Sequence, residues 1–242
     1  MSESVNTSVP ESEIDLKALE VQLLSGTEKN QLQAIAALAA AGVAGESVLG
    51  TFLCQRQSEA VVPTFVEGLC YEQLLRSTAP ESQMFLQQHF PTGIVPLTSE
   101  ANIDYKPLQR LLADHHFLEA DRVTLQKLCE LAGPAAMKRK WLYFSEVEGF
   151  PAMDLLTLNR LWQVHSEGKF GFSVQRQIWL SVGRNWEVLW PKIQWKAGKT
   201  WTRYPDEFVW DLSAPRGHLP LSNQLRGVQT MNALLSHPAW TL

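Results

Sequence analysis

The side chains best suited to binding a ligand lie between Lys169 and Arg203. Cations alternate there with indoles, and the only acid among them is Glu187. The cations are Lys169, Arg176, Arg184, Lys192, Lys196, Lys199 and Arg203, and the indoles are Trp179, Trp186, Trp190, Trp195 and Trp201. Flat apolar faces beside fixed positive charge suit a flat, apolar ligand that is anionic at one edge. The alternative is structural: the indoles fill a core and the cations are solvated.

No pattern typical of enzymatic chemistry accompanies this stretch. The chain has no Walker loop, dinucleotide-binding fingerprint, HExxH or GxSxG motif. Carboxylates are sparse after residue 140, and their spacing suggests no acid–base pair. We therefore expect a binding protein and not an enzyme.

Composition and charge favour a globular protein with two different halves. Residues 1–140 carry a net charge of -6 and residues 141–242 a net charge of +2, which together give the formal charge of -4. The three cysteines are far apart and form no CxxC pair, which is typical of free thiols in a reducing compartment. No apolar run approaches the ~20 residues that span a bilayer. We expect a cytoplasmic protein, and peripheral contact with a membrane stays open.

The first part of the chain predicts a bundle of helical hairpins. Residues 1–12 are polar and acidic and are expected to form a disordered tail. Residues 13–89 repeat apolar positions at helical spacing between glycine and proline breaks, which resembles HEAT-type hairpins. Two prolines and a glycine place a linker near 88–100. Such bundles bind proteins or support a neighbour, and both roles stay open.

The second part, residues 90–242, predicts a separate helical core. Helices are expected over 105–112 and 117–132, after Pro151, from Ser173 to Val182, and over 221–236. Residues 191–221 read as a long loop, whose aromatic content argues for order. His165 is expected to be a core histidine, and His115 and His116 to be solvated. Asp121 and Thr124 are expected to hydrogen-bond locally. The whole chain is thus predicted to be all-α.

A tetrapyrrole meets the demands of the aromatic and cationic residues. It is a rigid plate with two propionates on one edge, and arginine binds carboxylates in a bidentate way. Arg203 lies between Trp201 and Tyr204, and Arg226 lies in the last predicted helix. Composition adds Phe208 and Trp210 to the candidate binding residues. Two other functions stay open: a protein-interaction scaffold, and a binder of single-stranded nucleic acid, which the acidic overall charge disfavours.

Several distinctive motifs follow one another along the second part of the chain. The most distinctive is FGFSVQR at 170–176. It is supported by ADRVT at 120–124, WPKI at 190–193, WTR at 201–203 and DLSAPRGHLP at 211–220. Together these motifs resemble the genomes-uncoupled-four family of porphyrin-binding magnesium chelatase activators. The similarity covers about residues 90–240, and the N-terminal helices resemble the extra bundle of cyanobacterial members.

The resemblance implies a cupped apolar palm that binds protoporphyrin IX and magnesium protoporphyrin IX without catalysis. It implies a stimulatory partnership with the large porphyrin-binding subunit of magnesium chelatase, and we expect a monomer that does not bind nucleic acid. The matching ligand positions are Phe144, Trp201, Arg203, Tyr204, Asn223 and Arg226. Tyr204 replaces a family tryptophan. Asn223 is the position implied to approach the porphyrin magnesium, for which an amide oxygen is a suitable ligand.

Overall fold

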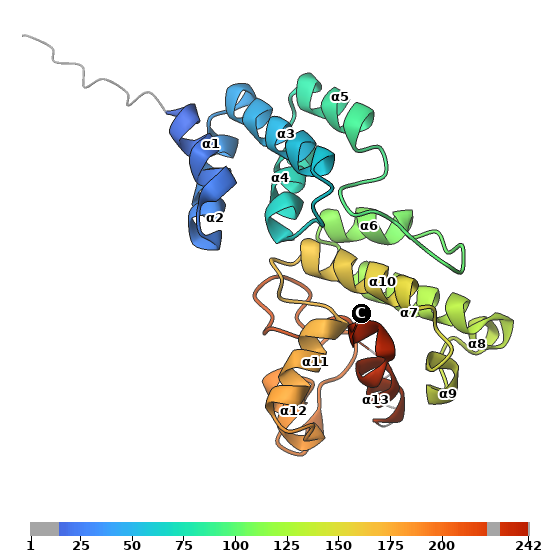
Figure 1. Cartoon of the computed structure of the whole chain (residues 1–242). Coiled ribbons are helices and arrows are strands. Elements are labelled where there is room, and N and C mark those ends of the chain that lie inside the picture. The colour runs from blue at the N-terminus through green and yellow to red at the C-terminus, as the bar shows by residue number, and fades with distance from the viewer. Residues whose placement is uncertain (1–14, 222–227, 242) are drawn as a thin grey trace, which may run out of the picture.

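The computed structural model describes residues 15–221 and 228–241 of the chain. The predicted all-α class is confirmed, because helices make up nearly all of the regular structure in this part of the chain (Figure 1). The sole strands described are a two-residue pair, β1 (Lys196–Ala197) and β2 (Thr200–Trp201), which form an antiparallel hairpin. The hairpin lies inside the predicted long loop and was not expected from the sequence.

The N-terminal part consists of antiparallel helical hairpins, as predicted. Its helices are α1 (Leu16–Ser25), α2 (Glu28–Ala40), α3 (Val43–Ser58), α4 (Phe65–Arg76) and α5 (Pro80–His89). Local signals start them: Asp15 Oδ1 accepts a hydrogen bond from Ala18 N at 3.0 Å, and Thr64 forms a capping box with Glu67. Leu23, Leu38 and Leu49 are fully buried between the helices, so packing of the apolar stripes stabilises the bundle.

An irregular connector, residues 90–105, joins the two parts, and one carboxylate attaches it to the core. Asp154 is fully buried on α10 (Ala152–Val164). It accepts hydrogen bonds from the Ser99 hydroxyl, from Glu100 N at 2.9 Å and from the Tyr105 hydroxyl at 2.9 Å. Burial and the neighbouring carboxylate raise the pKa of Tyr105, which therefore stays a neutral donor. The connector is thereby held against α10.

The C-terminal part is built around two helices that lie side by side, α7 (Phe117–Ala132) and α10 (Figure 1). Trp162 of α10 is fully buried, and its Nε1 donates to Thr124 Oγ1 of α7 at 2.9 Å. The surrounding helices are α6 (Lys106–Ala113), α8 (Pro134–Arg139), α9 (Phe144–Val147), α11 (Phe172–Ser181), α12 (Trp186–Lys192) and α13 (Gln229–Ser236), with a final 3-10 turn over Pro238–Thr241.

The two parts meet at a buried carboxylate. Glu72 on α4 accepts hydrogen bonds from His165 Nδ1 and His115 Nε2, both at 2.8 Å, and from Arg76 Nη2 at 3.3 Å. The predicted core role of His165 is confirmed. The expectation that His115 would be a solvated loop residue is wrong, because its ring is half-buried against Glu72. Helix α4 also approaches α10 closely: a Cβ on Gly68 would lie 2.3 Å from the carbonyl oxygen of Val164.

Two details of the last part differ from the sequence-based prediction. Helix α12 continues through Pro191 to Lys192, although we expected it to stop before the proline. The last helix begins at Gln229 in the described part of the chain, and Leu221, its predicted first residue, is irregular. Asp121 Oδ1 accepts a hydrogen bond from Leu221 N at 2.7 Å, and this distant contact attaches Leu221 to α7.

Candidate functional site

A ladder of stacked indoles forms the rigid centre of the tryptophan-rich region. Ring centroids are 4.9 Å apart for Trp179 and Trp186, 5.1 Å for Trp186 and Trp190, and 5.6 Å for Trp190 and Trp195. Helix α12 places Trp186 and Trp190 four residues apart, so they share one face. Trp179, Trp190 and Trp195 are at most 4% exposed. For these three, the structural alternative holds: they fill the core.

Trp201 extends this ladder to the surface. Its ring lies 5.6 Å from that of Trp190, and it is half-buried on β2. Lys196 Nζ lies 5.3 Å from the centroid of the Trp201 ring and forms an ion pair with Glu187 at 2.6 Å. The cation therefore packs on one part of the indole, and the buried ladder fixes the orientation of the ring.

The loop after β2 presents one cation and one aromatic ring to solvent. The Arg203 side chain is 82% exposed, and its closest carboxylate contact is Glu207 at 3.9 Å. Tyr204 is 42% exposed and meets the Trp210 ring edge-on at 5.8 Å. Its hydroxyl accepts a hydrogen bond from Arg122 Nε at 3.3 Å, which ties the loop to α7.

Phe208 and Trp210, the two residues added from composition, lie behind Tyr204. Phe208 is 5% exposed and packs 5.2 Å from the His218 ring. Trp210 is half-buried, and its Nε1 donates to Pro205 O at 2.9 Å. Both rings support the exposed part of the loop, and the small exposed area of Phe208 gives it little surface to offer a ligand.

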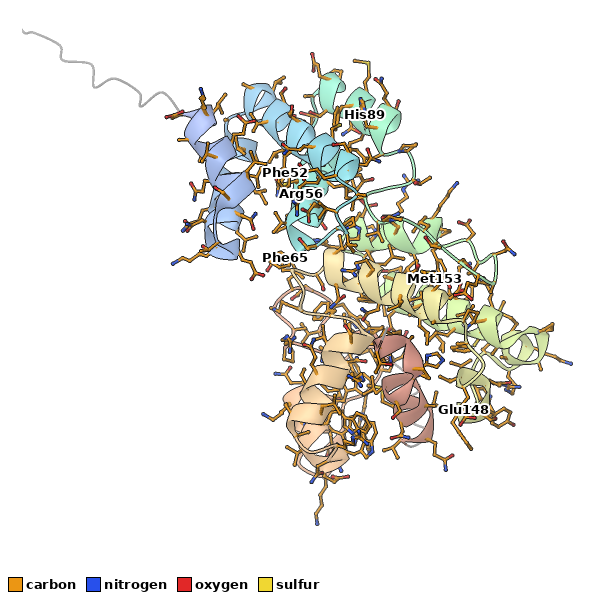
Figure 2. The ribbon with its side chains drawn as sticks, viewed as in Figure 1. Phe52, Arg56, Phe65, His89, Glu148 and Met153 are labelled. Carbon is orange, nitrogen blue, oxygen red and sulfur yellow. The ribbon has the colours of Figure 1, made fainter. Side chains whose placement is uncertain are left out.

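Phe144 lies apart from this group, at a cavity between α9 and α13. The cavity has a volume of about 520 Å³. It is lined by Phe144, Glu148, Gln229, Asn232, Ala233, Ser236, His237 and Pro238. Phe144 is 43% exposed, and Glu148, labelled in Figure 2, directly follows the end of α9. Of the predicted site residues that the structure describes, Phe144 alone lines this cavity.

The residues just before Phe144 form a cluster of contacts around Arg139 that was not predicted from the sequence. Tyr143 is 48% exposed, and the guanidinium carbon of Arg139 lies 4.4 Å from its ring centroid and 4.8 Å from that of Trp141. Arg139 Nη2 also contacts both carboxylate oxygens of Glu146 at 2.7 Å. The sequence signal for this cluster around Arg139 is the basic run at 138–140, which is followed by four large apolar residues.

The remaining predicted positions, Asn223 and Arg226, lie outside the described residues. The segment that carries them follows Leu221, whose amide is bound by Asp121. Asp121 is buried on α7, and burial raises the pKa of its carboxyl to about 7. The expected local pair between Asp121 and Thr124 is wrong, because Thr124 Oγ1 instead donates to Ala120 O at 2.8 Å.

Two other features, a metal site and a membrane-spanning helix, are absent from the described residues. Among residues 15–221 and 228–241, no group of three histidine, cysteine or acidic side chains could hold a metal ion. In the same ranges, no helix combines the length and apolar character needed to cross a bilayer.

The architecture defines an all-α protein in which a bundle of helical hairpins precedes a core rich in tryptophan, with aromatic and cationic side chains at its surface. The GUN4-like family model matches residues 98–238, and the model of the ARM-like repeat domain at the GUN4 N-terminus matches residues 7–91. The chain belongs to the GUN4 family. The N-terminal repeat makes it a member of the cyanobacterial type.

Relatives and solved structures agree with this assignment. The chain is 51% identical to the Ycf53-like protein of Synechocystis over 94% of its own length and 97% of the relative. It is 40% identical to the chloroplastic tetrapyrrole-binding protein of Arabidopsis thaliana, over 55% of this chain and 54% of that one. The structure of GUN4 from Chlamydomonas reinhardtii matches with a TM-score of 0.57 and 42% identity, covering 61% of this chain and 95% of that chain.

Proposed function

We propose that this chain binds protoporphyrin IX and magnesium protoporphyrin IX without changing them chemically, and that it thereby stimulates magnesium chelatase in chlorophyll synthesis. Family membership and the name of the Arabidopsis relative support tetrapyrrole binding. The observation that carries the proposal is the partial exposure of Trp201 and Tyr204 beside the buried indoles, together with that of Phe144 at the separate cavity between α9 and α13. Holding large aromatic rings in solvent has a cost that a planar ligand would recover on binding.

The roles of the residues follow from the chemistry of the ligand. Phe144, Trp201 and Tyr204 would cover the macrocycle, and a few partly buried rings supply several kcal/mol, at about 25 cal/mol per Å² of apolar surface. Phe208 and Trp210 would hold Tyr204 in place. Arg203 and Arg226 would pair with the propionates. Asn223 would approach the metal of the magnesium porphyrin through its amide oxygen.

The division of labour within the chain is part of the proposal. Residues 13–89 would form a supporting or partner-binding bundle, and residues 90–242 the porphyrin-binding domain. The partner would be the large porphyrin-binding subunit of the chelatase, met by a monomer in the cytoplasm or at the thylakoid surface. The ARM-like repeat match favours a second role for the bundle in protein contacts, since stacked helical repeats commonly form such surfaces.

A fluorescence titration tests porphyrin binding. Deuteroporphyrin added to the purified chain should quench tryptophan emission, because the indole ladder ends at the proposed site. Arg203→Gln should weaken binding, whereas Lys192→Gln, which removes one exposed cation from α12, should not. Absence of quenching at tens of micromolar porphyrin would refute the proposal. Equal losses for both variants would show a general charge effect.

A chelatase assay tests the second half of the proposal. The rate of magnesium insertion by the reconstituted enzyme should rise when the chain is added. Arg203→Gln should reduce that stimulation in proportion to the lost porphyrin affinity. Full stimulation by a variant that no longer binds porphyrin would separate the two activities and contradict the proposed link between them.

A further inference from the structure

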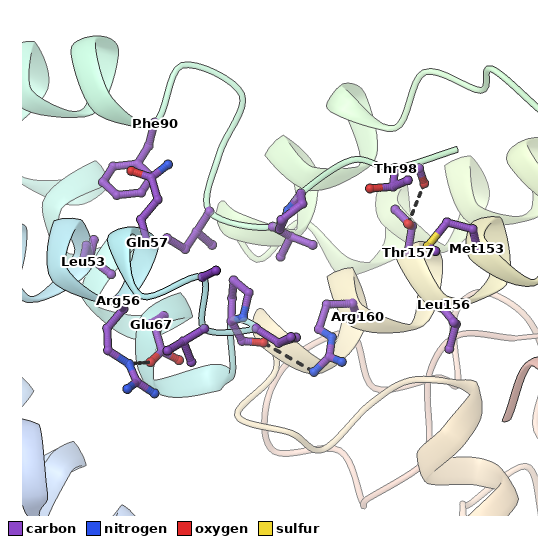
Figure 3. Close-up of a pocket in the computed structure, with 17 residues that line it drawn as sticks. Leu53, Arg56, Gln57, Glu67, Phe90, Thr98, Met153, Leu156, Thr157 and Arg160 are labelled. Atoms are coloured by element: carbon purple, nitrogen blue, oxygen red, sulfur yellow. Dashed lines mark hydrogen bonds and ion pairs between the residues drawn. The ribbon is translucent and has the colours of Figure 1, made fainter. Parts of the chain in front are cut away.

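A second cavity lies where the hairpin bundle meets the core, and none of the predicted porphyrin residues that the structure describes lines it (Figure 3). Its volume is about 440 Å³, within the range of small-molecule sites. The end of α3, the segment leading into α4, the connector and α10 all contribute to its wall. We call it the junction groove, and its lining residues are Leu53, Arg56, Gln57, Ala60, Val61, Val62, Pro63, Glu67, Phe90, Ile94, Val95, Pro96, Thr98, Met153, Leu156, Thr157 and Arg160.

Most of the groove is apolar. Phe90, Ile94 and Val95 are at most 8% exposed and form its base. Val62 and Met153 lie at its rim with exposed fractions of 56% and 39%. Apolar side chains left open at the edge of a concave surface favour an occupant with an apolar body.

One cation in the groove lacks an acidic partner. Arg160 on α10 is half-buried, and Figure 3 shows its guanidinium facing Pro63, whose carbonyl oxygen accepts a hydrogen bond from Nη1 at 3.5 Å. Among the described residues, no carboxylate lies within ion-pair distance of Arg160. Burial alone is the cause of its lowered pKa, yet arginine stays charged at neutral pH.

The acidic residue in the lining of the groove, Glu67, already has other partners. Glu67 Oε1 accepts from Arg56 Nε at 2.8 Å, and its Oε2 accepts from Thr64 N at 2.8 Å and from the Thr64 hydroxyl at 2.6 Å. Glu67 therefore closes the α4 capping box and pairs with Arg56, and both of its oxygens already have donors. The guanidinium of Arg160 keeps donors for an incoming anion, since it carries five N–H groups.

We propose that the junction groove binds a small apolar molecule that carries one carboxylate, with the carboxylate paired to Arg160 and the apolar body on the Phe90, Ile94 and Val95 base. The size of the cavity fits a small molecule. A half-buried guanidinium without an acid at the edge of an apolar surface has the complementary charge. Because helices of both parts form the wall, a bound ligand would stabilise their relative arrangement.

Octanoate is a simple probe for this site, and methionine methyl NMR of the full chain reports its position. Met153 lines the groove, whereas Met84 and Met137 are exposed at 61% and 37% on α5 and α8 and do not. Millimolar octanoate should shift the Met153 signal and leave the other two in place. Octan-1-ol has the same chain without the charge and should bind about ten-fold more weakly or worse. Equal shifts of all three methyl groups, or none at Met153, would overturn the proposal.

Three variants test the ion pair. Arg160→Gln should weaken octanoate about ten-fold or more, and an unchanged melting temperature would show that the fold is intact. Val62→Glu changes an exposed rim residue that precedes Pro63, the contact of Arg160, and introduces a carboxylate into the groove, so it should compete with octanoate without disturbing the core. Arg203→Gln should leave octanoate binding unchanged. Loss of octanoate binding in Arg203→Gln alone would move the ligand to the proposed porphyrin site and refute the junction groove.

Discussion

Asp121 provides the sharpest test of the physical account, because a single buried carboxyl holds the backbone just before the segment that carries Asn223 and Arg226. Its Oδ1 accepts the Leu221 amide at 2.7 Å, and burial raises its pKa from 3.8 to about 7. A carboxyl with a raised folded-state pKa binds its proton more tightly in the folded state. Its contribution to stability is therefore complete below about pH 4 and is lost as pH rises towards 7.

The size of this loss can be worked from the pKa values. Each unit of pKa difference corresponds to about 1.4 kcal/mol, so charging Asp121 costs up to about 4 kcal/mol by pH 8. Asp121→Asn cannot ionise, yet its amide oxygen can still accept from Leu221 N. We expect the variant to match the parent near pH 4 and to exceed it by about 2–4 kcal/mol near pH 8. For a chain of this length, that is roughly 4–16 °C in melting temperature.

Urea unfolding of both proteins at several pH values measures this difference. Other carboxyls, such as Glu72, titrate equally in both chains and cancel. Asp211→Asn serves as a control, because hydrogen bonds from Ser213 lower the pKa of this exposed carboxyl. Its difference in stability from the parent should therefore change with pH in the opposite direction to that of Asp121→Asn. A stability difference between Asp121→Asn and the parent that is flat across this pH range would refute the reasoning. It would mean that Asp121 does not change its charge there.

Three further outcomes follow from the same structure. Glu72→Gln should lower stability by about 3 kcal/mol, because it breaks the buried junction with two histidines, whereas the exposed Glu59→Gln should change stability by less than about 1 kcal/mol in the same urea assay. Phe144→Ala should raise the deuteroporphyrin dissociation constant about three-fold or more, and Val188→Ala, which has the same exposed fraction of 43%, should leave it unchanged. Trp195→Ala should cost about 3–5 kcal/mol in stability, since it empties the fully buried end of the indole ladder.

Local signals made most helices predictable from the sequence. Helix α7 runs from Phe117 to Ala132 as expected, because Gly133 and Pro134 end it. The start of α13 was not predictable in this way. Leu221 continues an apolar helical pattern, but its amide is bound by Asp121, which lies 100 residues earlier. A contact of that range has no signature in the segment itself.

The candidate site was predictable in residue type but not in exposure. Tyr204 and Phe208 are both aromatic and lie four residues apart, yet their exposed fractions are 42% and 5%. The difference arises because His218 packs on Phe208, while Arg122 of α7 meets only the hydroxyl of Tyr204. Both contacts come from other parts of the chain. Spacing alone therefore could not separate the supporting rings from the exposed ones.

The buried and exposed aromatic residues depend on each other physically. An exposed indole binds a flat ligand well only if its orientation is fixed beforehand, because ordering a mobile side chain on binding costs about 0.5–1.5 kcal/mol. In the stack from Trp179 to Trp195, Trp186 is half-buried and the other three rings are buried, and Trp201 rests against the third member, Trp190. Arg203 has the opposite character, since its side chain is 82% exposed and makes one long ion-pair contact. A fixed aromatic surface beside an exposed, movable cation suits a planar ligand with a charged edge. The ring system would pack on the aromatic surface first, and the cation would then pair with the charged edge.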